Sequence, residues 1–162
     1  MTTIPSTPYS HHLDGRDPLV VMREMIKAYR NLPGGWTDAQ WEMPTGPGKW
    51  TVRQVTIHLA QTELALGTRA RMALTTESFQ AQSFDQDRWL ARELGISGPD
   101  ALNVFIVLAS MNLALYESLT DADREITLNH NEHGPMTVNW VIYQEAGHQV
   151  HHFKQLTALL QP

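Results

Sequence analysis

Apolar residues recur at helical spacing in four long segments of this chain, and that pattern leaves little room for a sheet. Runs in which apolar and polar residues alternate never exceed four residues, and no Asn-Gly or Asp-Gly hairpin turn separates two apolar runs. The predicted helices run from Asp17 to the residues before Pro33, from Thr51 to about Thr75, from Pro99 through Tyr116 and from about Thr137 to Leu160. Four long helices, each with an apolar face, predict an all-α fold, a four-helix bundle.

Capping residues support two of these helix starts. Asp17 precedes Pro18, a pairing that is typical of an N-cap followed by proline in the first turn. Thr51 is followed three residues later by Gln54, which is the pattern of a capping box. The run Pro33-Gly34-Gly35 predicts the end of the first helix.

The remaining segments divide the chain into an N-terminal arm and one domain. Residues 1–16 show no apolar periodicity and are interpreted as an arm, so residues 17–162 form the predicted bundle domain. A crossover over residues 76–98 contains a predicted short helix around residues 85–94, and the polar stretch 129–135 is typical of a turn.

Composition excludes several classes of function. The 162 residues carry 17 acidic against 12 basic side chains, a net charge of −5, which disfavours a nucleic-acid binder because such proteins need a clustered basic face. The longest apolar run, Val104 to Ala109, is far shorter than a membrane span. The absence of cysteine excludes thiolate nucleophiles and Cys-ligated metals. We therefore expect a cytoplasmic protein that binds neither nucleic acid nor membrane.

The fourth predicted helix carries polar residues on the face that should point inward. Glu145, His148 and His152 continue the apolar stripe of Val138 and Val141 at steps of three and four residues. Two imidazoles four residues apart leave one helix face about one turn apart, so they can converge on one metal ion. On the second helix, His58 lies on or beside the apolar stripe and supplies a third candidate ligand.

Other polar residues have competing interpretations. An inward histidine can also be a hydrogen-bonded core residue, and His151 is read as peripheral. Glu145 is the candidate catalytic residue, either as a general base or as a group that orients a ligand, but it could equally pair with Arg69 or another buried donor. Gln54 and Gln144 are further candidates for holding a ligand histidine. The histidines at positions 11, 12, 130 and 133 are interpreted as loop residues.

Three blocks of the sequence resemble the DinB-like (DinB/YfiT) metalloprotein family. They are GKWTVRQVTIHLAQTE at 48–63, SFDQDRWL at 83–90 and EAGHQVHHFKQL at 145–156. The resemblance implies a four-helix bundle with up-down-down-up connections, often a homodimer, which holds zinc or nickel through three histidines. Carried over position by position, it assigns the metal to His58, His148 and His152.

Three histidine ligands leave an open coordination position, which is typical of catalytic rather than structural sites. The resemblance adds thiol-dependent transferases that use a low-molecular-weight thiol as cosubstrate. The sequence thus predicts a metal-dependent enzyme acting on a small electrophilic molecule, by thiol transfer or by hydrolysis. The alternative is a non-catalytic, stress-related helical homodimer whose metal is structural or absent.

Overall fold

Four long helices form the body of the molecule, as the sequence predicted. The structure is a computed structural model that describes residues 4–32 and 36–160. The bundle helices are α1 (Pro18–Asn31), α3 (Val52–Thr75), α5 (Gly98–Glu117) and α7 (Val138–Thr157). Each bundle helix packs against two others, so that the order around the bundle is α1, α5, α3 and α7.

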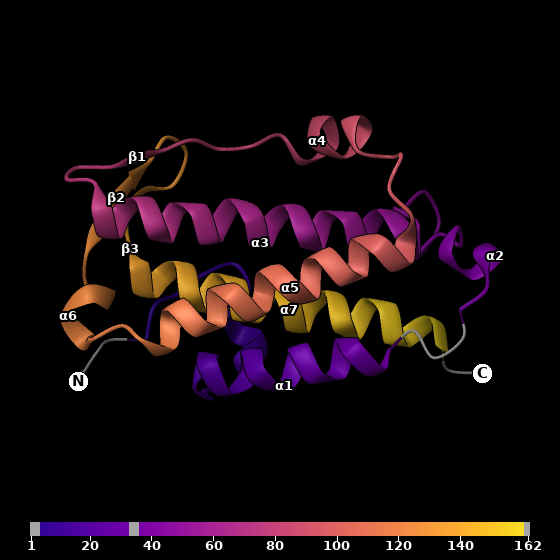
Figure 1. Ribbon diagram of the computed structural model, residues 1–162, viewed down its shortest axis with the longest axis horizontal. Coiled ribbons are helices and arrows are strands. Elements are labelled where there is room, and N and C mark those ends of the chain that lie inside the picture. Colours follow the sequence, from indigo (N-terminus) through magenta and orange to yellow (C-terminus); the bar gives the residue numbers. More distant parts are fainter. Residues whose placement is uncertain (1–3, 33–35, 161–162) are drawn as a thin grey trace.

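The directions of the helices follow the up-down-down-up pattern. In Figure 1, α1 and α7 run one way along the bundle, and α3 and α5 run the other way. The two parallel neighbours α3 and α5 require a connection that returns along the full length of the bundle, and residues 76–97 make it. This topology places α3 directly beside α7, the two helices that carry the candidate metal ligands.

The predicted caps are present. The carboxylate of Asp17 accepts hydrogen bonds from the backbone N–H groups of Leu19 and Val20, and Thr51 and Gln54 form the capping box that begins α3. The first helix ends at Asn31. The predicted stop at Pro33–Gly35 lies outside the described residues.

Short helices and turns join the long ones. They are η1 (Ser10–Leu13), α2 (Asp38–Trp41), α4 (Gln86–Arg92), α6 (Asp121–Arg124) and η2 (Ala158–Leu160). The helix α4 confirms the short helix predicted around residues 85–94. The last predicted turn of the fourth helix is the separate 3₁₀ turn η2, because the α-helical pattern ends at Thr157.

A small sheet at one end of the bundle corrects the prediction of a turn over residues 129–135. The strands β2 (Thr127–His130) and β3 (Gly134–Thr137) form an antiparallel hairpin, and β1 (Gln80–Ala81) pairs with β2 in parallel. Each strand has at most four residues, so the alternating pattern is too short to distinguish from a loop. Packing supplies the stability, because Leu128 and Met136 are buried in the core.

The N-terminal segment docks on α7. Leu13 of η1 is buried, and the backbone carbonyl of Tyr9 packs against α7 at Gly147, where a β-carbon would lie 2.3 Å from that oxygen. Only glycine permits this approach. The docked segment places the Tyr9 ring edge-on to His148, with 5.0–5.1 Å between its centroid and those of His148 and His151.

Helix α5 combines a buried face with an apolar outer face. Phe105, Ala109 and Tyr116 are completely buried, whereas Val104 and Val107 are exposed. Among the described helices, α5 alone has the length and hydropathy of a membrane span. Of its apolar 18-residue stretch, 39% is buried inside the bundle. A core helix of a helical bundle meets the same two criteria.

Candidate metal centre

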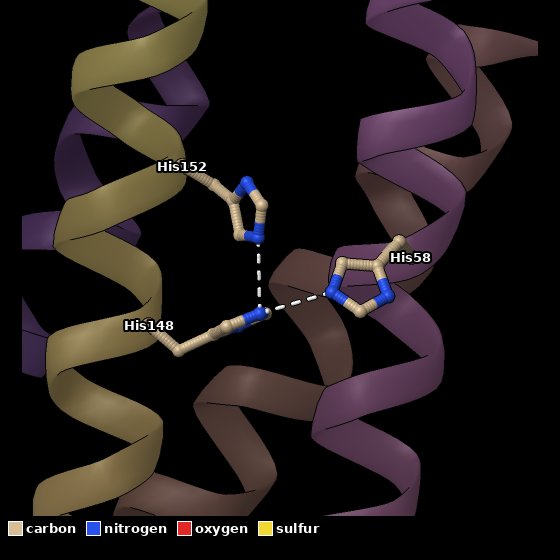
Figure 2. A group of neighbouring side chains, drawn as sticks. All are labelled: His58, His148 and His152. Atoms are coloured by element: carbon tan, nitrogen blue, oxygen red, sulfur yellow. Dashed lines mark hydrogen bonds between the residues drawn. The ribbon is translucent and has the colours of Figure 1, made fainter. Parts of the chain in front are cut away.

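Three histidines from two neighbouring helices meet in the interior of the bundle. The Nε2 atom of His148 lies 3.0 Å from Nε2 of His58 and 3.0 Å from Nε2 of His152 (Figure 2). The three side chains are 5%, 3% and 7% exposed for His58, His148 and His152 respectively. The structure thus brings together the three residues that the sequence predicted as metal ligands.

The helical framework explains this convergence. His148 and His152 are one turn apart on α7, so both rings leave the same face, and the ring centroids are 4.4 Å apart. His58 reaches them from the first half of α3, which packs directly on α7. Figure 2 shows the three imidazoles pointing toward one another in the space between these two helices.

Burial keeps the three imidazoles neutral. It lowers the pKa of His58 to about 4, with a smaller contribution from the charge of His151. Burial and the nearby His58 lower the pKa of His152 to about 3. The pKa of His148 is also lowered, by burial first and then by the two neighbouring imidazoles. At neutral pH each ring therefore has a lone pair free to bind a metal.

A glutamine fixes the orientation of one ring. Nδ1 of His152 lies 2.7 Å from Oε1 of Gln155, an amide oxygen that can only accept, so the Nδ1 atom carries the proton and Nε2 presents its lone pair. Gln155 in turn donates to Thr45 Oγ1 at 3.0 Å, and Thr45 donates to the carbonyl oxygen of Trp50. This chain of bonds ties the ligand helix to the turn that begins α3.

The donor set fits a divalent ion. Zinc–imidazole distances are about 2.0–2.1 Å, so nitrogens that share one ion are at most about 4 Å apart, and the two separations of 3.0 Å from His148 Nε2 meet this limit. Within the described part of the chain, the group that could hold a metal here contains these three histidines and no carboxylate. Neutral imidazole nitrogens suit zinc, nickel, copper or iron.

A cavity opens beside two of the three histidines, His58 and His148. Its volume is about 200 Å³, and its walls include Tyr9, His58, Thr62, Arg69, His130 and His148. The arm, α3, the hairpin and α7 all contribute to it. A ligand of the metal could therefore reach into a space whose far wall is built by the crossover and the hairpin.

Glu145, the candidate catalytic residue, is placed away from this cavity wall. It is completely buried, and it accepts hydrogen bonds from the Tyr116 hydroxyl at 2.7 Å and from Asn112 Nδ2 at 3.1 Å. This placement favours the alternative that Glu145 pairs with buried donors. Arg69, the other partner considered for it, donates instead to the carbonyl oxygen of Gln82.

A second buried carboxyl group, that of Glu63, joins this cluster. Burial raises the pKa of Glu63 and that of Glu145, and the charge of Glu145 raises the pKa of Glu63 further. Of the two groups, Glu63 has the pKa that is raised further, which favours its protonated form. Asn112 and Gln149 donate to Glu63 as well. The cluster links α3, α5 and α7 directly beside the metal ligands.

Other polar predictions have specific outcomes. Gln54 completes the capping box, and Gln144 lies on the cavity wall with a buried Oε1 that has no partner among the described residues. His151 is half-buried, and its Nδ1 lies 3.2 Å from Nε2 of His12 in the docked arm. His12 was interpreted as a loop residue, and the arm instead brings it to α7.

Several residues of the site carried no signal in the sequence. Tyr9 and His130 reach the cavity only because the arm and the hairpin fold back on the bundle. Trp50, whose ring centroid is 5.0 Å from that of His58, precedes the helix that carries this ligand. Gln155 could have been found, since it lies one turn beyond His152 on the same stripe of α7.

Comparisons with known proteins agree with this fold. A protein of Oceanobacillus iheyensis with the provisional name of metal-dependent hydrolase is 26% identical over 90% of each chain, and one of Bacillus cereus with the same name is 30% identical over 84% of this chain and 77% of its own. YfiT from Bacillus subtilis, described as a candidate metal-dependent hydrolase with an unusual four-helix bundle topology, superposes with a TM-score of 0.81 at 23% identity, covering 98% of this chain and 91% of that one. The four-helix bundle protein TT2238 gives a TM-score of 0.56 at 21% identity, covering 93% and 98%. The sequence profile of the DinB superfamily matches residues 22–156, which run from α1 into the last turn of α7. The chain belongs to that superfamily.

Proposed function

We propose that this protein is a metal-dependent enzyme in which His58, His148 and His152 hold a divalent zinc or nickel ion. The observation that carries the proposal is the convergence of three neutral Nε2 atoms beside a cavity, with no carboxylate in the group among the described residues. Such a site leaves a coordination position for a substrate or a nucleophile. The provisional names of the relatives support metal-dependent hydrolysis.

A bound ion would lower the pKa of water or a thiol at the open position and polarise a substrate carbonyl. The chain's own residues prepare the site for this chemistry. Gln155 holds His152 in the tautomer that presents Nε2. Tyr9 and Trp50 lie edge-on or tilted against the ligand rings and exclude water from their flanks. Glu63 and Glu145 hold the three helices in register behind the ligands.

Hydrolysis and thiol transfer make different demands on the same site. Because the chain has no cysteine, a sulfur nucleophile must come from a cosubstrate such as a low-molecular-weight thiol. The test is turnover of a panel of activated esters and alkyl halides by the zinc- or nickel-loaded protein, with and without added thiol. Turnover without thiol supports hydrolysis, and turnover that needs thiol supports the transferase.

The competing proposal is a non-catalytic homodimer whose metal is structural. It predicts that a fourth protein group fills the metal's shell and that no electrophile in the panel is consumed. A water-exchangeable position on the bound metal, measured by water proton relaxation in a cobalt- or nickel-loaded sample, would contradict it.

We also propose that the protein forms a homodimer. The support is a set of exposed apolar side chains on α5 and α3, namely Val104, Val107 and Met111 with Leu64 and Met72. Leu64 and Val104 line the same groove, and exposed apolar surface shared by two helices is typical of a protein interface. Light scattering should give a dimer for the native chain and a monomer for Val107→Glu.

A further inference from the structure

The wall of the cavity carries buried polar atoms whose hydrogen bonds are unmade. Seven buried side-chain atoms in the described part of the chain lack a partner, and four of these belong to residues that line the cavity. They are Nδ1 of His58, Oγ1 of Thr62, Nε2 of His130 and Oε1 of Gln144. Leaving such groups unpaired costs about 1–3 kcal/mol each. A polar ligand that enters this cavity would offer them hydrogen-bond partners.

His130 is a fixed hydrogen-bond donor toward this cavity. Its side chain is 4% exposed, and its Nδ1 accepts from the backbone N–H groups of Glu132 at 3.2 Å and His133 at 3.3 Å. Since Nδ1 is the acceptor, the single proton of the neutral ring sits on Nε2. Nε2 is the buried atom without a partner, so it offers an N–H group to whatever occupies the cavity.

Arg69 supplies a positive charge at the same wall. One of its Nη atoms donates to the Gln82 carbonyl oxygen at 2.6 Å, and its guanidinium carbon lies 5.9 Å from the centre of the Phe84 ring. These two contacts hold the Arg69 guanidinium in place. Only one of its five N–H donors is used by the Gln82 carbonyl oxygen, so the others can bind a ligand. Burial lowers the pKa of the His130 imidazole, and the charge of the nearby Arg69 guanidinium lowers it further.

We propose that Arg69 and His130 form an anion subsite opposite the three histidines, and that the substrate is a small molecule bearing a carboxylate. Planar carboxylates match the guanidinium fork, and His130 Nε2–H and the Thr62 hydroxyl are further unpartnered donors of residues in the same cavity wall. The cavity of about 200 Å³ is smaller than the roughly 300–1,000 Å³ of a typical drug-sized pocket, which limits the substrate to a few heavy atoms. This inference rests on the proposed function, because it names the substrate class of that metal site.

One positive charge favours a carboxylate over a phosphate. Burial lowers the pKa of Arg69, and the charge of Glu132, which also lines the cavity, partly opposes this lowering, so the local charge is already partly balanced. A dianionic phosphate would be left with excess negative charge beside Glu132. A monoanionic carboxylate would not.

The same wall does not suit a second metal ion. His130, Glu132 and His133 lie close enough together to be considered as ligands. However, binding through Nε2 would move the ring proton of His130 to Nδ1, where it would face two backbone N–H donors. The tautomer therefore makes His130 a donor for an anion rather than a ligand for a cation.

The test uses two-headed probes on the zinc-loaded protein. The monohydroxamates of succinic and glutaric acid place a zinc-binding group at one end and a carboxylate at the other, and butyric and valeric hydroxamic acids are their neutral counterparts. We expect at least one acid probe to bind about tenfold or more tighter than its neutral counterpart by calorimetry. Arg69→Gln should remove this preference, Arg69→Lys should restore part of it, and neutral probes should bind all variants equally.

Controls separate the subsite from the fold and from the metal site. Arg88→Gln removes an exposed arginine of α4 and should keep the preference. His130→Phe should reduce the preference while zinc content stays unchanged, and circular dichroism checks that each variant is folded. An equal preference in native protein and Arg69→Gln, or no preference with either acid probe, would overturn the subsite. Binding of a second zinc ion that His130→Phe abolishes would overturn it as well.

If no hydroxamate binds at all, the proposed open metal site has failed rather than the subsite. The subsite is then tested by adding glutarate to the zinc-free protein and following the Nε2–H proton resonance of His130. A saturable shift in the native chain that is absent in Arg69→Gln supports the anion subsite. A resonance that does not move in the native chain rejects it.

Discussion

Gln155 fixes the tautomer of His152 through a hydrogen bond of 2.7 Å between its Oε1 and the imidazole Nδ1. The bond decides which nitrogen of His152 faces His148, and it is held in place because Gln155 also donates to Thr45. Groups that orient a ligand in this way contribute to metal affinity without touching the metal.

Replacing this glutamine should therefore weaken metal binding while leaving the fold intact. We expect Gln155→Leu to lower zinc affinity by about 10- to 100-fold, since the imidazole loses the acceptor that fixes its proton. Gln155→Glu keeps an acceptor at the same place and should retain most of the affinity. Competition with a chromogenic chelator measures both, and equal affinities for Gln155→Leu and the native chain would show that the bond does not orient the ligand.

Gly147 should be intolerant of even the smallest side chain. Alanine normally stabilises a helix relative to glycine by about 1 kcal/mol, but a β-carbon here would lie 2.3 Å from the Tyr9 carbonyl oxygen. Gly147→Ala should thus lower the free energy of unfolding by about 1–3 kcal/mol and release the arm to protease. Gly95→Ala, at a position with open space around it, serves as the control and should leave both measurements unchanged. A more stable Gly147→Ala variant would mean that the arm does not dock as described.

Glu63 should give the protein a stability that falls as pH rises. Burial and the charge of Glu145 hold the pKa of Glu63 well above its usual range, so the folded state binds a proton that the unfolded state releases above about pH 4.3. This contribution is fully present below that pH and is lost as pH rises toward the folded pKa.

Urea unfolding between about pH 5 and 8 tests this prediction with two variants. Glu63→Gln removes the titrating group, so its stability should decline less across this range than that of the native chain. Glu77→Gln, at an exposed position, should follow the native curve. Parallel curves for Glu63→Gln and the native chain would show that Glu63 is not protonated in the fold.

The sequence was sufficient for the long helices and for the three converging histidines. The sequence signals for these features are local. The capping box of Thr51 and Gln54 lies within the first turn of α3, and the spacing of His148 and His152 lies within α7. The pairing of His58 with α7 required only that both helices face one core.

Features that depend on distant packing could not be predicted in this way. The hairpin of β2 and β3 has strands of four residues, and it places His130 at the cavity only by packing on the end of the bundle. The position of Tyr9 depends on Gly147, which looks like any helical glycine until the arm is seen against it. The hydrogen-bond partners of Glu145 could not be predicted either, because Asn112 and Tyr116 lie on another helix.

The central claim is that His58, His148 and His152 hold one divalent metal ion, and metal content measures it most directly. The untagged native chain, His148→Ala and the control His11→Ala would be loaded with zinc or nickel, desalted and analysed by inductively coupled plasma mass spectrometry. We predict about one ion per chain for the native protein and for His11→Ala, and close to none for a still-helical His148→Ala. Equal metal content in all three, or none in the native chain after loading, would contradict the account.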